Sequence, residues 1–226
     1  MIVNFYVQEK GERHMKQDIS VYLWQAASQG HQGHREVSQA AHDFVRRHIA
    51  QLTGREPSQL VFGRTKRGKP YVDNAGICFN ISHSGGMVAA AFSECEIGVD
   101  IEALRPVNER IAARYFAASD RRYLAMTADP QERRRRFFEM WTAKEAYLKR
   151  FGVGLSGGLD FPVADENGRL SAVASDHLPS AEIYYRFVSE EEFFTDGQGG
   201  TAKDAVQYGL SVCADCIGKV FLNMTI

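Results

Sequence analysis

Asp100 and Glu102 have residue types and a spacing that indicate chemistry. They lie in the segment GVDIE, where Ile97, Val99 and Ile101 alternate with polar or small residues. Such alternation predicts a β-strand, on which residues two apart share one side, with Cα atoms ~7 Å apart. Two neighbouring carboxylates repel each other, and a hard divalent ion such as Mg²⁺ would relieve that repulsion. The alternative is an exposed strand face with two solvated carboxylates.

A third carboxylate, Glu145, lies on a predicted helix. Phe138, Trp141 and Leu148 have the spacing of a buried helical stripe, and Glu145 interrupts that stripe with a charge. Burying a carboxylate without a partner costs several kcal/mol. One interpretation is a structural ion pair with Lys149, one turn further along at i+4. The other is that Glu145 is a third metal ligand and that Lys149 faces a phosphate.

A polar turn is predicted after the strand at 77–82. His83 lies between Ser82 and Ser84, and two glycines follow. Glycine lets a ligand or another backbone come close, so this turn is a candidate anion site. Lys69, in the basic turn TKRGKP, could reach the same anion. The alternative is that His83 is an ordinary polar turn residue.

The elements that position these residues follow from the periodicity of apolar residues. We predict strands at 18–25, 60–63, 77–82, 87–92, 97–102, 169–174, 182–188 and 206–214, and helices at 35–52, 108–117, 119–127 and 131–151. Glycines close the first and last of these helices. Strands and helices occur in both halves of the chain, which indicates an α+β protein with two similar lobes.

Composition excludes several classes of protein. The 226 residues are 44% hydrophobic and 24% charged with a net charge of −1, which is typical of a globular enzyme and gives no general attraction to nucleic acid. No apolar run approaches the ~20 residues of a membrane span, and the early charges do not suit a signal peptide. We therefore expect a cytoplasmic protein. Cys213 and Cys216 form a C-x-x-C without a second pair, so we expect reduced structural thiols.

A basic run, Arg133 to Arg136, opens the predicted long helix. A solvated helix face is the usual explanation of such a run. The other explanation is a docking surface that attracts an acidic partner.

Several motifs together resemble the surfactin-type class of 4′-phosphopantetheinyl transferases. They are GKPY (68–71), FNISHSG (79–85), GVDIE (98–102), RYF (114–116), WTAKEAYLK (141–149) and GVGL (152–155). They occur in the family's order and spacing, and the likeness is dense from about Gly68 to Leu155. Outside that stretch the sequence departs from the family's pattern, including the upstream basic residues that usually grip the 3′-phosphate of coenzyme A.

The resemblance implies a reaction. Such enzymes transfer the 4′-phosphopantetheine arm of coenzyme A to a serine of an apo acyl or peptidyl carrier protein, and release adenosine 3′,5′-bisphosphate. The family fold is a pseudo-dimer of two α+β lobes with coenzyme A between them. The lobes would be 1–104 and 105–226, and we expect a monomer because one chain supplies both.

The resemblance also implies roles for individual residues. Metal ligands for Mg²⁺, or alternatively Mn²⁺, would be Asp100, Glu102 and Glu145. Contacts with coenzyme A would come from Lys69, Ser82, His83, Lys144 and Lys149. Glu145 is also a candidate base for the carrier serine, and Lys149 would neutralise charge on the pyrophosphate.

Two other functions fit part of this pattern. Another Mg²⁺-dependent phosphoryl-transfer enzyme, such as a nucleotide hydrolase, would explain three carboxylates but not the combination of FNISHSG and WTAKEAYLK. A catalytically inactive module that only binds carrier proteins would explain the motifs. No acidic motif position is lost, however, which argues against it.

Overall fold

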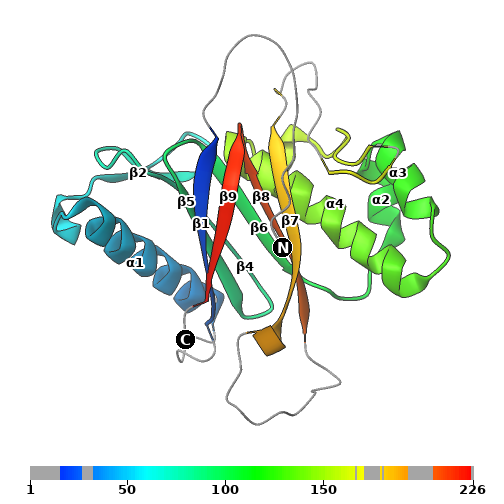
Figure 1. Ribbon diagram of the computed structural model, residues 1–226, viewed down its shortest axis with the longest axis horizontal. Coiled ribbons are helices and arrows are strands. Elements are labelled where there is room, and N and C mark those ends of the chain that lie inside the picture. Colours follow the sequence, from blue (N-terminus) through cyan, green and yellow to red (C-terminus); the bar gives the residue numbers. More distant parts are fainter. Residues whose placement is uncertain are drawn as a thin grey trace.

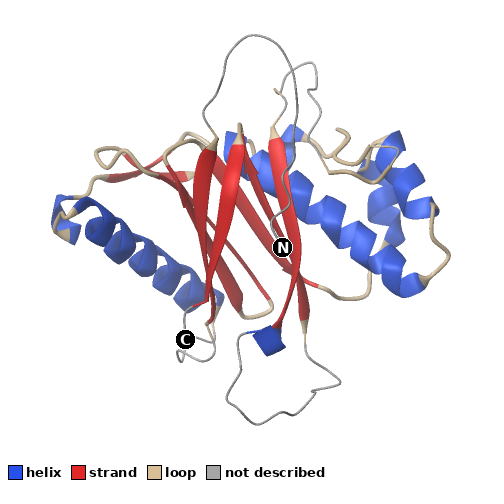
Figure 2. Ribbon diagram, in the orientation of Figure 1, coloured by secondary structure: helices blue, strands red, loops and turns tan. Residues whose placement is uncertain are grey.

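The computed structural model describes residues 16–26, 33–165, 167–170, 179, 181–192 and 206–224. Within these residues, two β-sheets pack face to face and a long helix covers the outer side of each (Figure 1). Figure 2 shows the same arrangement as strands in the middle and helices outside. The α+β class predicted from the sequence is therefore confirmed.

The first sheet has the strand order β4-β5-β1-β9. Its members are β1 (Gln17–Gln25), β4 (Cys78–Ser84), β5 (Met87–Ser93) and β9 (Ile217–Met224). Strand β5 is antiparallel to β4 and to β1, whereas β9 runs parallel to β1. Helix α1 (His34–Thr53) covers this sheet and ends at Gly54, whose φ of 64° is a conformation that glycine adopts without strain.

The second sheet has the order β6-β8-β7, and all of its pairs are antiparallel. Its members are β6 (Ile97–Ala103), β7 (Glu182–Ser189) and β8 (Gln207–Ala214). Helix α4 (Pro130–Phe151) lies across it. The Asp129 side chain caps the start of α4 by accepting hydrogen bonds from the backbone N–H groups of Gln131 and Glu132, and Gly152 ends it at φ 63°.

Shorter elements complete the fold. They are α2 (Glu109–Tyr115), α3 (Ala118–Ala125), β2 (Phe62–Arg64), β3 (Pro70–Val72) and the 3-10 turns η2 (Pro57–Gln59), η3 (Leu155–Gly157) and η4 (Glu190–Glu192). Within the described residues, no helix is long and apolar enough to cross a membrane.

The apolar faces of both sheets form the core between them. Val21 and Leu23 of β1 meet Val99 and Ile101 of β6 and Leu210 of β8, and all five are fully buried. Because strand residues alternate in direction, this burial turns Asp100 and Glu102 of β6 the other way, towards α4. The polar side of β6 therefore lies against a helix and not in open solvent.

Most predicted elements agree with the structure to within a few residues. The sequence analysis missed β3 and β9, and the strand predicted at 169–174 lies mostly outside the described residues. Strand β9 could not be predicted because its polar and apolar residues do not alternate cleanly. Parallel pairing with β1 holds it in the sheet.

Candidate active site

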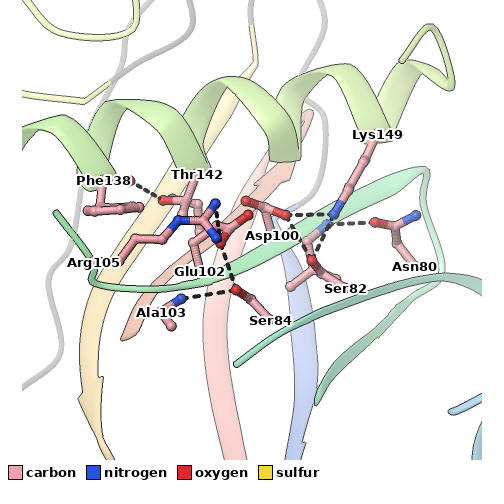
Figure 3. Close-up of polar contacts among 12 residues, drawn as sticks. Asn80, Ser82, Ser84, Asp100, Glu102, Ala103, Arg105, Phe138, Thr142 and Lys149 are labelled. Carbon is pink, nitrogen blue, oxygen red and sulfur yellow. Dashed lines mark hydrogen bonds and ion pairs between the residues drawn. The ribbon is translucent and has the colours of Figure 1, made fainter. Parts of the chain in front are cut away.

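The candidate site lies between β6 and α4, beside the edge strand β4 (Figure 3). Asp100 is only 3% exposed, so the idea of two freely solvated carboxylates on an open strand is wrong. The side chain of Glu102 is 20% exposed and lies at the rim. Burial of these charges requires polar partners nearby.

Asp100 is held from two directions. Its Oδ1 accepts a hydrogen bond from Lys149 Nζ of α4 at 2.6 Å and another from Ser82 Oγ of β4 at 2.8 Å. Lys149 Nζ also donates to Ser82 Oγ at 2.8 Å. Asp100 Oδ2, in contrast, is buried and has no hydrogen-bond partner among the residues that the structure describes. The ion pair of Lys149 is therefore with Asp100, and not with Glu145 as the structural alternative supposed.

Glu102 receives a hydrogen bond from Ser84 Oγ at 2.6 Å, and Arg105 lies 3.9 Å away at the surface. Burial raises the pKa of Glu102, and the charge of Asp100 adds to this rise, while the Ser84 hydrogen bond opposes it. The two hydrogen-bonded serines thus come from β4 and reach across to carboxylates of the other sheet (Figure 3).

Glu145 faces the same two carboxylates from α4. Its pKa is raised to about 7, mainly by burial and then by the charges of Asp100 and Glu102, while Lys149 opposes the rise. A carboxyl group with this pKa exchanges its proton near neutral pH, which suits a proton acceptor. Three carboxylates that repel one another in this way are also a donor set for a cation.

The chemistry of these residues fits a hard divalent cation. Mg²⁺ takes oxygen ligands, and the buried, unpartnered Asp100 Oδ2 is an oxygen that lacks a donor. Among the residues that the structure describes, no three His, Cys, Asp or Glu side chains are already arranged as a metal site. Lys149 instead neutralises part of the charge through Asp100 Oδ1.

His83 lies beside this network. Its ring centroid is 4.7 Å from that of His34 at the start of α1, in an edge-to-face arrangement. Burial lowers the pKa of His83, as do the nearby charges of His34 and Lys149. No local sequence pattern relates His34, at the start of α1, to His83 near the end of β4, so this contact could not be predicted.

Asn80 is a second residue that the sequence analysis left without a role. It is 5% exposed, and its Oδ1 accepts a hydrogen bond from the backbone N–H of Val99 at 2.9 Å. This bond joins β4 to β6 next to Asp100, and it thereby fixes the distance between Ser82 and Asp100. In FNISHSG, Asn80 and Ser82 alternate with Phe79 and Ile81, so the sequence already places Asn80 on the same side of β4 as Ser82.

Lys69 belongs to a separate network. Its Nζ contacts Glu96 Oε2 and donates to the backbone carbonyls of Arg150 at 2.7 Å and Ile97 at 3.3 Å. Its side chain is only 11% exposed. Lys69 therefore joins the end of α4 to the start of β6, and all three of its donors have protein acceptors.

Lys144 does not lie at the site. It is fully buried on the opposite face of α4, where its Nζ pairs with Asp120 Oδ2 at 2.7 Å and donates to the carbonyls of Leu159 and Phe161. The structure thus corrects the expectation that Lys144 lies along the pyrophosphate. Lys144 and Lys149 are five residues apart, so on a helix their side chains point in directions about 140° apart. The two lysines therefore lie on different faces of α4.

The basic run at the start of α4 borders a groove of about 980 Å³ between α2, α3 and α4. Arg133 pairs with Glu109 at 2.9 Å and Arg136 with Glu132 at 3.0 Å, so these two arginines are already neutralised. Arg110, Arg121, Arg133 and Arg134 line the groove. The four arginines from Arg133 to Arg136 therefore do not form a uniformly solvated helix face, and not all of their charges are free to attract a partner.

Comparison with known proteins gives a consistent family. The model of the "4′-phosphopantetheinyl transferase superfamily" matches residues 96–200. The chain is 34% identical over 138 residues to 4′-phosphopantetheinyl transferase psf-1 of Bacillus pumilus, covering 59% of this chain and 58% of that protein. It is 37% identical over 140 residues to 4′-phosphopantetheinyl transferase Sfp of Bacillus subtilis, covering 60% and 62%. A third relative, HetI of Nostoc, is 36% identical over 131 residues, covering 54% of each chain. The matches thus span about three fifths of the length of these relatives.

Proposed function

We propose that this chain, whose residues 96–200 belong to the 4′-phosphopantetheinyl transferase superfamily, transfers the phosphopantetheine arm of coenzyme A to a serine of an apo carrier protein. The observation that carries the proposal is the meeting of Asp100, Glu102, Glu145 and Lys149 between β6 and α4. These residues lie inside the matched segment, and their chemistry is that of phosphoryl transfer.

The proposed reaction makes one bond and breaks one bond. The serine oxygen of the carrier forms a bond to the β-phosphorus of coenzyme A, and the pyrophosphate P–O bond breaks. Adenosine 3′,5′-bisphosphate leaves with the electron pair, and the serine proton passes to Glu145. The pKa of about 7 belongs to the metal-free site, and a bound cation would lower it, so the roles of Glu145 as base and as metal ligand compete.

Asp100, Glu102 and Glu145 would hold Mg²⁺, which would neutralise pyrophosphate charge when bound. Lys149 provides a positive charge next to the same place, and Ser82 holds its ammonium group in position. His83, with a lowered pKa, is a donor for a phosphate or nucleotide at the edge of the site. Lys69 could contact a phosphate only by exchanging one of its present acceptors.

The two-lobe arrangement is part of the proposal. Each half of the chain supplies most strands of one sheet and a long outer helix, which supports a pseudo-dimer. The boundary at residue 104 is crossed in both directions, since β6 pairs with β8 and β9 pairs with β1. Coenzyme A would bind near the junction, where β4 of one sheet meets β6 of the other. A cytoplasmic monomer agrees with this organisation.

The groove between α2, α3 and α4 is the proposed docking surface for the carrier. Carrier proteins of this kind are typically acidic, and Arg110, Arg121 and Arg134 give the groove positive charge. Such charge mainly speeds encounter and orients the partner. Whether the carrier is of the acyl or the peptidyl type is a question for the same assay.

The test is to incubate the protein with an apo carrier, coenzyme A and Mg²⁺ and to weigh the intact carrier by mass spectrometry. The expected result is a gain of one phosphopantetheine that EDTA and Glu145→Gln both abolish. Release of adenosine 3′,5′-bisphosphate without modified carrier would favour a hydrolase. Coenzyme A binding without transfer to any of several acyl and peptidyl carriers would favour a binding module.

A further inference from the structure

Thr142 and Ser211 form a buried hydrogen-bonded pair beside the candidate site. Both side chains are fully buried, and their hydroxyl oxygens are 2.8 Å apart, one on α4 and the other on β8. Ser211 lies directly opposite Asp100 in the antiparallel pairing of β6 and β8. Residues opposite each other in such a pair share one face with Cβ atoms ~5 Å apart, so the Ser211 hydroxyl can turn towards Asp100.

Either hydroxyl could be the donor in this bond, and we assign its direction from the two backbone carbonyls within reach of Thr142 Oγ1, Phe138 at 2.9 Å and Glu139 at 3.3 Å. Thr142 Oγ1 donates its single proton to the backbone carbonyl of Phe138 at 2.9 Å (Figure 3). A hydroxyl has one proton to donate and lone pairs to accept with. With that proton on the Phe138 carbonyl, Ser211 is the donor to Thr142, and its proton is directed at α4 and away from Asp100.

This arrangement explains why Asp100 Oδ2 has no partner although it is buried. Asp100 Oδ1 accepts hydrogen bonds from Lys149 and Ser82, and Ser211 is the residue opposite Asp100 on β8. A buried acceptor without a donor is costly, so such an oxygen normally takes any proton within reach. Thr142 accepts the proton of Ser211, the residue opposite Asp100.

We infer that Thr142 is a positioning residue that leaves Asp100 Oδ2 free for a divalent cation by holding the proton of Ser211. The inference rests on the proposed function, in which Asp100 is a cation ligand. Thr142 does not contact the cation or the reacting atoms; it acts through Ser211. Without an acceptor at position 142, Ser211 turns to Asp100 and donates to the oxygen that the cation needs.

The test uses Thr142→Val, which keeps the shape of the side chain and removes the acceptor. Mn²⁺ is titrated into the full-length protein with coenzyme A present, and free Mn²⁺ is measured by electron paramagnetic resonance. Thr142→Val should weaken Mn²⁺ binding about tenfold, the size typical of losing an interaction that supports a metal ligand. Thr142→Ser, which keeps the hydroxyl, should bind as the wild type does.

The double variant Thr142→Val with Ser211→Ala separates this role from packing. It has no hydroxyl that can reach Asp100, so Mn²⁺ affinity should return towards the wild-type value, and Ser211→Ala alone should have little effect. A purely structural role predicts the opposite, because the second substitution would add to the damage. A crystal structure of Thr142→Val without metal should show Ser211 Oγ within hydrogen-bond distance of Asp100 Oδ2.

The outcomes separate the inference from the proposed function. If the wild type binds Mn²⁺ and Thr142→Val binds it equally well, the inference is overturned and the cation site stands. It is also overturned if the double variant is weaker than Thr142→Val, or if Ser211 turns to another acceptor such as Tyr185, its neighbour on β7. A wild type that binds no Mn²⁺ beyond a protein-free sample with coenzyme A overturns the cation site and the inference together.

Discussion

Lys144 and Lys149 lie on the same helix, yet their ammonium groups serve opposite sides of it. Lys144 Nζ is fully buried and 2.7 Å from Asp120 Oδ2, whereas Lys149 Nζ is 2.6 Å from Asp100 Oδ1 in the candidate site. Asp120 Oδ1 also accepts from the backbone N–H groups of Val163 and Ala164. One lysine therefore joins α4 to the core behind it, and the other provides charge for chemistry.

The two lysines should respond differently to replacement by methionine. Lys144→Met leaves the buried Asp120 without its cation and should lower the free energy of unfolding by about 3–5 kcal/mol. Lys149→Met also leaves a buried carboxylate, Asp100, without its cation, so it should lower stability, but by less because the Lys149 side chain is 28% exposed, and it should abolish transfer. Urea unfolding and the carrier mass assay check the pair. An active and stable Lys144→Met would contradict the structural role.

Gly98 should be irreplaceable because α4 crosses directly over it. A Cβ atom at Gly98 would lie 1.9 Å from the backbone oxygen of Ala146 and 2.5 Å from the backbone nitrogen of Arg150. Backbone cannot move away locally, so Gly98→Ala should displace α4 from β6 and cost about 3 kcal/mol or more. Both Mg²⁺-dependent transfer and stability should fall together, as measured by urea unfolding and by the mass assay.

The matched control for this change is Gly209→Ala. Gly209 lies on β8, opposite Glu102, and a Cβ there would meet the Tyr185 hydroxyl at 3.4 Å and Thr142 at 3.6 Å, which are ordinary contact distances. This variant should fold and unfold like the wild type. If Gly98→Ala and Gly209→Ala lose stability and transfer activity equally, the close passage of α4 over β6 does not explain the effect of Gly98→Ala.

Glu139 should make stability depend on pH. Burial raises its pKa from 4.5 to about 7, and a hydrogen bond from Tyr123 at 3.2 Å only partly opposes this. Between these values the folded state keeps a proton that the unfolded state has lost, so the free energy of unfolding falls as pH rises from 4.5 to 7. Glu139→Gln lacks this titration and should lose that part of the slope.

Urea unfolding at several pH values measures this effect. The free energy of unfolding of Glu139→Gln, relative to that of the wild type, should increase by about 1–2 kcal/mol between pH 4.5 and pH 8. This is less than the whole pKa shift would give, because Glu139 is partly exposed and solvent screens its charge. Glu191→Gln, at an exposed position in η4, is the control and should keep the wild-type slope. Parallel profiles for all three proteins would contradict the buried titration of Glu139.

Arg134 should contribute to carrier docking. It lines the groove between α2, α3 and α4, and no ion pair holds it among the described residues. Arg134→Glu should raise the KM for an acidic carrier by about 3- to 10-fold at low salt, and this difference should shrink as salt screens the charges. The KM for coenzyme A should stay the same.

The control is Lys219→Glu on β9, which makes the same change of net charge at an exposed position of the other sheet. It should leave the KM for the carrier unchanged in steady-state assays. If both variants weaken the carrier reaction equally, the overall charge of the protein steers the carrier and the groove has no special part in it.

The sequence by itself determined the local features of this protein. The alternation in GVDIE predicts the strand and places Asp100 and Glu102 on one side, and glycines and a proline mark the ends of α4. The order of the motifs indicated a resemblance to 4′-phosphopantetheinyl transferases, and the model of that superfamily matches residues 96–200. These features are local because strand and helix periodicity depend on neighbours within a few residues.

Only the tertiary structure decided which distant residues meet. It paired Lys149 with Asp100, sent Lys144 to the core, brought His34 against His83 and placed Ser211 opposite Asp100. It also showed β6 and β9 crossing between the two halves of the chain. Strand register and helix rotation set these contacts, and both depend on packing across the whole fold, which no short stretch of sequence encodes.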